Sequence, residues 1–278
     1  MIIGIDLGGS STKAVALDRG VILGYTVVPT TEPLASAIGA MGTLLMELGK
    51  QIGDIEILAV CGGKSTALPG SILGSKVRKV DEIQAIGLGG IFLSSKKQAL
   101  VVSMGTGTAI VATRKNGTEI EHIGGTGVGG GSLIGLSRRL LNTSDINLIE
   151  SLAQKGDLTK VNLRVGDVVG GPIGKLDPDA TASNFGGLRD DATSADIAAG
   201  ILNVIGEVIG MLAVVSARAT GLENDVVLVG RLTKIGSLVR YIIKTGQLFK
   251  VAMAVPDLAE YCAAVGAARF CTLDSPRG

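Results

Sequence analysis

The sequence predicts an α/β fold built twice, with two lobes and a cleft between them. A strand pattern recurs 97 positions along the chain, helical patterns follow each copy, and glycine is unusually frequent, with 42 residues in 278. Two copies of a strand pattern that each lead into α/β crossovers describe two similar lobes. We expect an N-terminal lobe over residues 1–96 and a C-terminal lobe over 97–278.

The internal repeat aligns without gaps. A shift of 97 positions places Gly8 on Gly105 and Gly20 on Gly117. Each copy has an apolar strand, a turn of small residues, a second strand, a tight turn and a third strand. Each copy is therefore predicted to be a three-stranded meander.

Hydrophobic periodicity predicts the elements that follow each meander. In the first half these are a helix at 34–51, a strand at 55–60 and a helix at 81–92. In the second half they are helices at 132–141, 145–154 and 194–220, a strand at 226–229, and helices at 233–247 and 258–271. Asn203 and Glu207 interrupt the longest apolar stretch, so a buried or interface helix is expected there rather than a membrane span.

Composition excludes several classes of partner. Lys and Arg number 26 against 25 Asp and Glu, so no polybasic field is present to hold nucleic acid or a membrane surface. The three cysteines have neither disulfide nor metal spacing, and the N-terminus has no signal-peptide pattern. We expect a cytoplasmic protein that binds neither nucleic acid nor a membrane.

Three glycine clusters predict a phosphate site. They are DLGGSSTK at 6–13, GTGT at 105–108 and GGTGVGGG at 124–131, the last leading into a helix at Ser132. Backbone N–H groups in tight turns bind phosphate, glycine lets the backbone approach closely, and a helix start adds its dipole. Because the first two clusters are equivalent in the repeat, we expect them to grip one nucleoside triphosphate from opposite sides of the cleft.

Two charged residues accompany the first cluster. Asp6 ends an apolar strand, where a carboxylate either holds Mg²⁺ between phosphates or caps the turn. Lys13 lies among apolar residues, where it is either solvated or offsets the charge of a γ-phosphate.

The motifs resemble the superfamily of actin, sugar kinases and Hsp70, and most closely the type II pantothenate kinases. The carriers are DLGGSSTK at 6–13, VDEIQA at 80–85, SMGTGT at 103–108, HIGGTGVGGGSLIGL at 122–136, LRVGDVVGG at 163–171, TASNFG at 181–186 and VVLVG at 226–230. The resemblance implies a duplicated actin-like (ribonuclease H-like) ATPase fold. It also implies a homodimer that phosphorylates pantothenate to 4′-phosphopantothenate with ATP and Mg²⁺, the first step of coenzyme A biosynthesis.

Matching positions imply roles for individual residues. Glu82 takes the place of the general base, although composition alone would make it a helix-start charge. The implied catalytic set is Glu82, Asp6 and Lys13, with Asp6 as the metal ligand. The implied nucleotide-binding set is Asp6, Gly8, Gly9, Ser10, Ser11, Thr12, Lys13, Gly105, Thr106, Gly107, Gly130, Gly131, Ser132, Gly230 and Arg231. The implied acceptor-binding set is Glu82, Thr106, His122, Thr181 and Ala182, the last two from the partner protomer.

Three residues depart from the family pattern, and one of them is Ala109, which stands where some relatives place a serine whose hydroxyl could meet the substrate. His122 stands where relatives usually carry an arginine that touches the acceptor, and imidazole has fewer donors and a shorter reach. Arg231 follows Gly230 where a small residue near adenine is common, which could alter nucleotide affinity.

Other readings stay open. A catalytically altered or non-enzymatic ATP-binding relative, or a kinase for a related acceptor such as pantetheine, fits the same motifs. An ATP-driven activator of dehydratases shares the architecture but needs cysteine ligands for an iron–sulfur cluster, for which Cys61 is the one plausible candidate. A sugar kinase would place its base in a different motif and often carries a zinc-binding cysteine cluster, and neither is found in the sequence.

Overall fold

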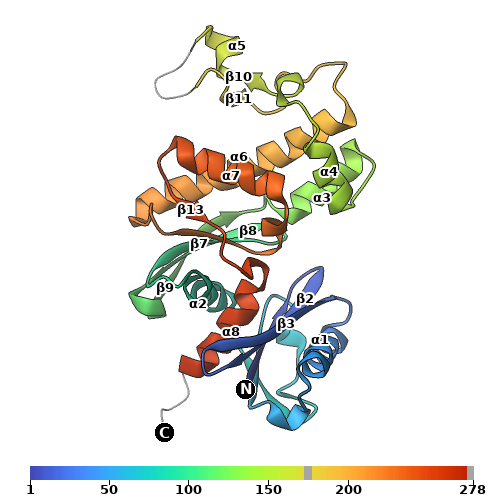
Figure 1. Cartoon of the computed structure of the whole chain (residues 1–278), viewed down its shortest axis with the longest axis vertical. Coiled ribbons are helices and arrows are strands. Elements are labelled where there is room, and N and C mark those ends of the chain that lie inside the picture. The colour runs from blue at the N-terminus through green and yellow to red at the C-terminus, as the bar shows by residue number, and fades with distance from the viewer. Residues whose placement is uncertain (172–176, 274–278) are drawn as a thin grey trace.

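The computed structural model describes residues 1–171 and 177–273. Two sheets, each with helices beside it, are stacked along the long axis of the molecule (Figure 1). The first half contains β1 Ile2–Leu7, β2 Ser11–Asp18, β3 Val21–Pro29, α1 Pro33–Leu48, β4 Ile57–Cys61, β5 Ser71–Ile72, β6 Ser75–Lys79 and α2 Glu82–Ser94.

The second half repeats this plan with insertions. It contains β7 Ala99–Met104, β8 Thr108–Arg114, β9 Glu119–Thr126, α3 Gly130–Leu140, α4 Ile146–Ala153, β10 Leu163–Arg164, α5 Val165–Val169, β11 Thr181–Ser183, α6 Ser194–Thr220, β12 Val226–Val229, α7 Gly236–Leu248, β13 Met253–Ala254 and α8 Cys262–Leu273.

The two sheets share one topology, which confirms the predicted duplication. The first has the order β3-β2-β1-β4-β6-β5 and the second the order β13-β12-β7-β8-β9. In each sheet the first strand pairs antiparallel with the second and parallel with a strand that arrives after a helix, β4 for β1 and β12 for β7. Strands β1 and β7 begin 97 residues apart, the period found in the sequence.

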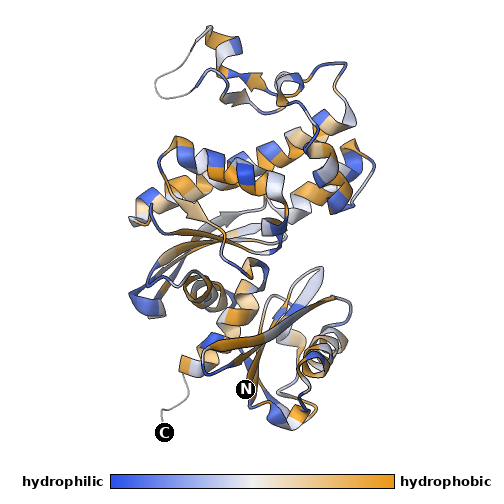
Figure 2. Ribbon diagram, viewed as in Figure 1, coloured by the Kyte–Doolittle hydropathy of each residue, from blue (hydrophilic) through white to orange (hydrophobic). Residues whose placement is uncertain are grey.

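The helix α6 is the main cover of the second sheet. Its Ile201, Leu202 and Ile205 are buried in one cluster with Leu100 and Val102 of β7. It is long and apolar enough to cross a membrane, but 67% of its apolar window is buried inside the protein, as in a core helix. Hydrophobic turns, in orange, are seen along α6 in Figure 2.

Helices α2 and α8 join the two lobes. They pack against each other so closely that a Cβ added at Gly266 of α8 would lie 1.7 Å from the Ala85 carbonyl oxygen of α2. Helix α8 also crosses β1, where a Cβ at Gly4 would lie 1.9 Å from the Ala264 carbonyl oxygen. These glycines are needed for close backbone approach, so part of the glycine excess serves packing rather than binding. The predicted lobe boundary at 96/97 precedes β7, although α8 returns to the first sheet.

Several short elements have no counterpart in the sequence prediction. The strand β6 has the sequence SKVRK, whose polar, partly exposed side chains give no apolar run to detect. The pair β10 and β11 is only two and three residues long. All the helices predicted from the sequence are present. The one predicted to begin at 233 starts later, at Gly236, because a 3-10 turn at Arg231–Lys234 precedes α7.

Candidate active site

The structure brings the two equivalent glycine turns together. The turn between β1 and β2 carries Gly9, and a Cβ added there would lie 3.5 Å from Thr106 Oγ1 in the turn between β7 and β8. Both turns are open to solvent, with Gly9, Ser10, Gly105 and Thr106 exposed. Since backbone N–H groups at such turns bind phosphate, the pair can grip one polyphosphate from two sides.

A largely buried ion pair lies next to the first turn. Asp6 and Lys13 are directly opposed across β1 and β2, and Lys13 Nζ lies 3.1 Å from Asp6 Oδ2. The Lys13 side chain is only 9% exposed, so of the two alternatives for this residue a solvated lysine does not hold. Burial holds both charged ends in place, because an unpaired charge at this depth would be costly.

Glu82 is the first residue of α2, and its side chain is partly covered by the protein yet still reached by solvent. The side chain of the preceding Asp81 accepts hydrogen bonds from the Ile83 and Gln84 N–H groups and so fixes the helix start. Partial burial raises the pKa of Glu82 above its usual 4.5, the negative charges of Asp6 and Asp81 raise it further, and Lys13 lowers it. Glu82 therefore lies within electrostatic reach of the Asp6–Lys13 pair, and its carboxylate is a stronger base than an ordinary glutamate.

The third glycine run supports the second turn. The N–H groups of Gly130 and Gly131 donate to the carbonyl oxygens of Gly105 and Thr106, at 2.9 and 2.8 Å. A Cβ at Gly129 would lie 2.7 Å from the Thr106 carbonyl oxygen. These two N–H groups at the start of α3 are therefore occupied within the protein. The glycines let the β9–α3 connection pack against the turn between β7 and β8, while Ser132 Oγ donates to the Gly127 carbonyl oxygen at 3.1 Å.

Within the first turn, the hydroxyls have different partners. Thr12 is fully buried and its Oγ1 shares a hydrogen bond of 2.8 Å with Thr30 Oγ1. Ser11 is also buried, whereas Ser10 is exposed and accepts a hydrogen bond from Arg231 Nη1 at 3.0 Å. This contact between residues far apart in sequence was not predicted, because neither residue gives any sign of the other.

His122 is exposed on β9, next to a bulge between Ile110 and Val111 on the paired strand β8. Strand β9 runs antiparallel to α2. A Cβ at Gly117 would meet Leu88, and a Cβ at Gly87 would meet Ile120. These contacts pack the β8–β9 hairpin against α2, the helix that begins at Glu82.

The segment with Thr181 and Ala182 lies elsewhere. Strand β11 sits beyond α6 at one end of the molecule, and the β1–β2 turn belongs to the opposite lobe (Figure 1). Glu207 of α6 fastens this segment: its Oε1 accepts from Thr181 Oγ1 at 2.7 Å and its Oε2 from Asn184 Nδ2 at 2.8 Å. One chain alone does not bring Thr181 to Glu82.

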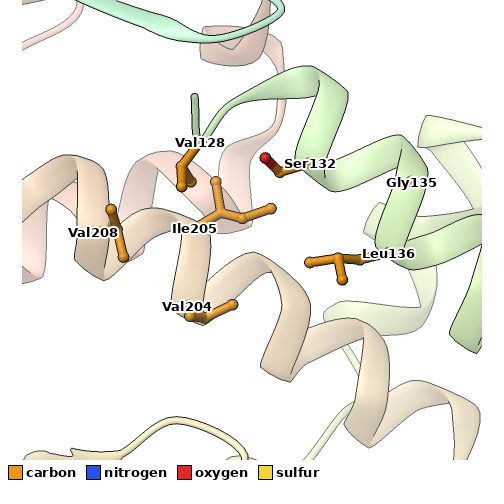
Figure 3. A pocket seen from close by; sticks show the side chains of 7 residues that line it. All are labelled: Val128, Ser132, Gly135, Leu136, Val204, Ile205 and Val208. Atoms are coloured by element: carbon orange, nitrogen blue, oxygen red, sulfur yellow. The ribbon is translucent and has the colours of Figure 1, made fainter. Parts of the chain in front are cut away.

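An apolar groove of about 410 Å³ runs between α3 and α6. Figure 3 shows Ser132 and Leu136 of α3 facing Val204, Ile205 and Val208 of α6 across it. A second hollow continues along α6 from Val208 past exposed Met211 and Val215. The sequence carried a signal for this surface, since the apolar residues 204, 208, 211 and 215 recur at helical spacing.

The described residues hold no group of three or more His, Cys, Asp or Glu side chains arranged as a metal site. Cys61 is fully buried, and its Sγ lies 3.5 Å from the Ala263 carbonyl oxygen. A thiol in that position is not available as a cluster ligand at a subunit interface, which argues against an iron–sulfur activator.

Known proteins resemble this chain over most of its length. The Fumble family model matches residues 98–247. Type II pantothenate kinase from Bacillus anthracis is 30% identical over 231 residues, 80% of each chain, and that from Oceanobacillus iheyensis is 28% identical over 273 residues, 95% of this chain and 97% of the relative.

Solved structures share the fold. The activator of 2-hydroxyisocaproyl-CoA dehydratase from Clostridium difficile, with bound ADPNP, has a TM-score of 0.70 at 17% identity, covering 97% of this chain and 93% of the other. A ROK family glucokinase from Streptomyces griseus, in complex with glucose and AMPPNP, has a TM-score of 0.62 at 14% identity, covering 97% and 98%. With its actin-like ATPase fold and these relatives, the chain belongs to the Fumble family, as a member of the type II pantothenate kinases.

Proposed function

We propose that this protein phosphorylates pantothenate with ATP to give 4′-phosphopantothenate, the first step of coenzyme A biosynthesis. The observation that carries the proposal is the meeting of two equivalent glycine turns beside Asp6, Lys13 and Glu82. Family membership indicates the class of reaction, and the two turns with their charged neighbours indicate where in the protein it takes place.

The residues divide the work of phosphoryl transfer. The two turns hold the polyphosphate so that the terminal phosphorus faces the acceptor hydroxyl, and positioning of this kind supplies most of the catalysis. Glu82 accepts the hydroxyl proton as the new O–P bond forms and the bond to the ADP oxygen breaks. Its raised pKa suits a base that must take a proton and release it again.

Asp6 is the proposed magnesium ligand. Mg²⁺ commonly uses one or two protein carboxylates and completes its shell with phosphate oxygens and water. Asp6 Oδ2 is paired with Lys13, and a Cβ at Gly62 would lie 2.9 Å from Oδ1, so glycine leaves room beside that oxygen. The donor set fits the ion, which when bound offsets the phosphate charge.

The acceptor site requires a second copy of the chain. We infer a homodimer in which Thr181 and Ala182 of one protomer complete the pantothenate site of its partner. The rigid attachment of Thr181 to Glu207 supports this role. The apolar groove on α6 supports an interface, because Leu136 and Met211 are each 40% exposed and Val215 is 58% exposed.

The dimer has its own test. Val208→Glu places a charge in the groove and should convert a dimer into a monomer of 28.2 kDa in sedimentation. Val21→Glu is the matched control, since Val21 is 61% exposed on β3 in the other lobe. A wild-type protein that sediments as a monomer would contradict the dimer.

The reaction is tested by ADP release with pantothenate, pantetheine and several sugars in parallel. We expect release with pantothenate and none with sugars. Pantetheine is the second candidate acceptor, favoured by His122 in place of the family arginine, and selective ADP release with it would reassign the substrate. ATP binding without ADP release for any acceptor would show a non-enzymatic relative. Action in the cytoplasm stays a prediction.

A further inference from the structure

One hydrogen bond joins the two lobes across the mouth of the cleft. Arg231 Nη1 donates to Ser10 Oγ at 3.0 Å, with 221 residues between them in the chain. Ser10 belongs to the first glycine turn, and Arg231 opens the 3-10 turn that follows β12. The bond therefore spans the gap that the proposed function assigns to the phosphates.

Gly230 directs Arg231 toward this gap. It has a φ of 95°, a left-handed value that favours glycine. A Cβ there would lie 2.5 Å from the carbonyl oxygen of Met104, the residue before Gly105. The end of β12 is thus pressed against the base of the second glycine turn, and Arg231 reaches from there to the first.

The charge of Arg231 lacks an ionic partner among the described residues. Lys13 is paired with Asp6, and Lys234 in the same 3-10 turn lies 2.7 Å from Glu260. Arg231 is exposed, and its hydrogen-bond partner is a neutral hydroxyl. A guanidinium binds phosphate through a planar fork of donors, and the negative charge of a phosphate adds an ionic attraction that the neutral serine hydroxyl cannot supply. A phosphate in the gap is therefore a stronger partner for Arg231 than the serine.

We propose that Arg231 is a phosphate clamp that leaves Ser10 and binds the polyphosphate chain when a nucleotide enters the cleft. The inference rests on the ATP-dependent function proposed above and adds what selects the nucleotide. The family resemblance places this position near adenine, whereas the reach to Ser10 assigns the charge to the phosphates. Arg231 then discriminates nucleotides by their phosphates rather than by their base.

The test compares nucleotides that differ only in phosphate. Calorimetric Kd values for ATP and ADP, and ligand-observed NMR titrations for adenosine, would be measured on the wild-type dimer and on Arg231→Gln. We expect ATP and ADP to bind about 10- to 100-fold more weakly to the variant, the range for loss of a charge-assisted hydrogen bond. Adenosine affinity should change less than about twofold, and Arg231→Lys should recover part of the loss.

Lys234→Gln is the matched control, since it removes a neighbouring positive charge that Glu260 already pairs. Its ATP affinity should equal that of wild type. Equal losses for adenosine and ATP in Arg231→Gln would overturn the clamp in favour of a contact with the base. If Arg231→Gln and Lys234→Gln weakened ATP binding equally, the clamp would be overturned, because the overall positive charge of the region would then account for the loss. A wild type that binds no ATP refutes the proposed function itself, whereas unchanged ATP affinity in Arg231→Gln refutes the clamp alone.

Discussion

Replacing Glu82 with glutamine removes the proposed base while keeping the size of the side chain. Glu82 is exposed at the first position of α2, and Asp81 holds the helix start independently, so the fold should survive. Positioned proton transfer contributes about 10²- to 10⁴-fold to a rate. We expect kcat to fall by at least about 10²-fold, or about 2.7 kcal/mol of transition-state stabilisation, with ATP affinity unchanged.

The pH profile separates this role from a structural one. The pKa of Glu82 is raised above 4.5 by partial burial and by Asp6 and Asp81. The base works only when deprotonated, so wild-type kcat/KM should fall as the pH drops through this raised pKa. In Glu82→Gln that acid limb should disappear. The assay is steady-state ADP release between about pH 4 and pH 8, the range around a glutamate pKa raised above its reference value. Unchanged turnover in the variant, or an acid limb that persists in it, would refute the assignment.

Three further changes test the surroundings of the site. Lys13→Met leaves the Asp6 carboxylate buried without its partner, and should lower the free energy of unfolding by about 3–5 kcal/mol in urea titrations; no loss would show that the pair is dispensable. Gly266→Ala forces a methyl group against the Ala85 carbonyl oxygen, 1.7 Å away, and should cost about 1–3 kcal/mol or more, seen as a lower Tm; an equal Tm would contradict the close helix packing. Asp196→Asn removes a carboxylate whose pKa is lowered from 3.8 by hydrogen bonds from the backbone N–H groups of Asp157 and Thr193. Its stabilisation is fully present above this reference value and lost on acidification, so the gap in unfolding free energy from wild type should narrow as the pH falls below 3.8, and a constant gap would contradict this.

The repeat made the fold predictable from sequence. Gly8 and Gly105 mark equivalent turns because both follow an apolar strand, and the 97-residue period held to the strand starts of β1 and β7. Local pattern is enough here, since each meander folds from neighbouring residues. Because the two turns are equivalent in the repeat, the sequence also predicts that they face each other across the cleft.

The partners of individual side chains could not be predicted. The pairing of Lys13 with Asp6 depends on the register of the β1–β2 hairpin, and the bond from Arg231 to Ser10 depends on how the two lobes pack. In the sequence Glu207 only interrupts an apolar stretch, whereas in the structure its carboxylate accepts a hydrogen bond from Thr181. The sequence predicts that Gly130 and Gly131 bind the nucleotide, yet their N–H groups donate to carbonyl oxygens of the second turn. In each case the residue type suggested a role in the sequence, but the residue that it contacts could not be predicted.

A crystal structure with a non-hydrolysable ATP analogue and pantothenate tests the central claim most directly. The account predicts the terminal phosphate between the Gly8–Ser11 and Gly105–Thr108 turns, with the Glu82 carboxylate about 2.6–3.2 Å from the pantothenate hydroxyl, the reach of a general base. A nucleotide bound away from either turn, or an acceptor hydroxyl out of reach of Glu82, would contradict it.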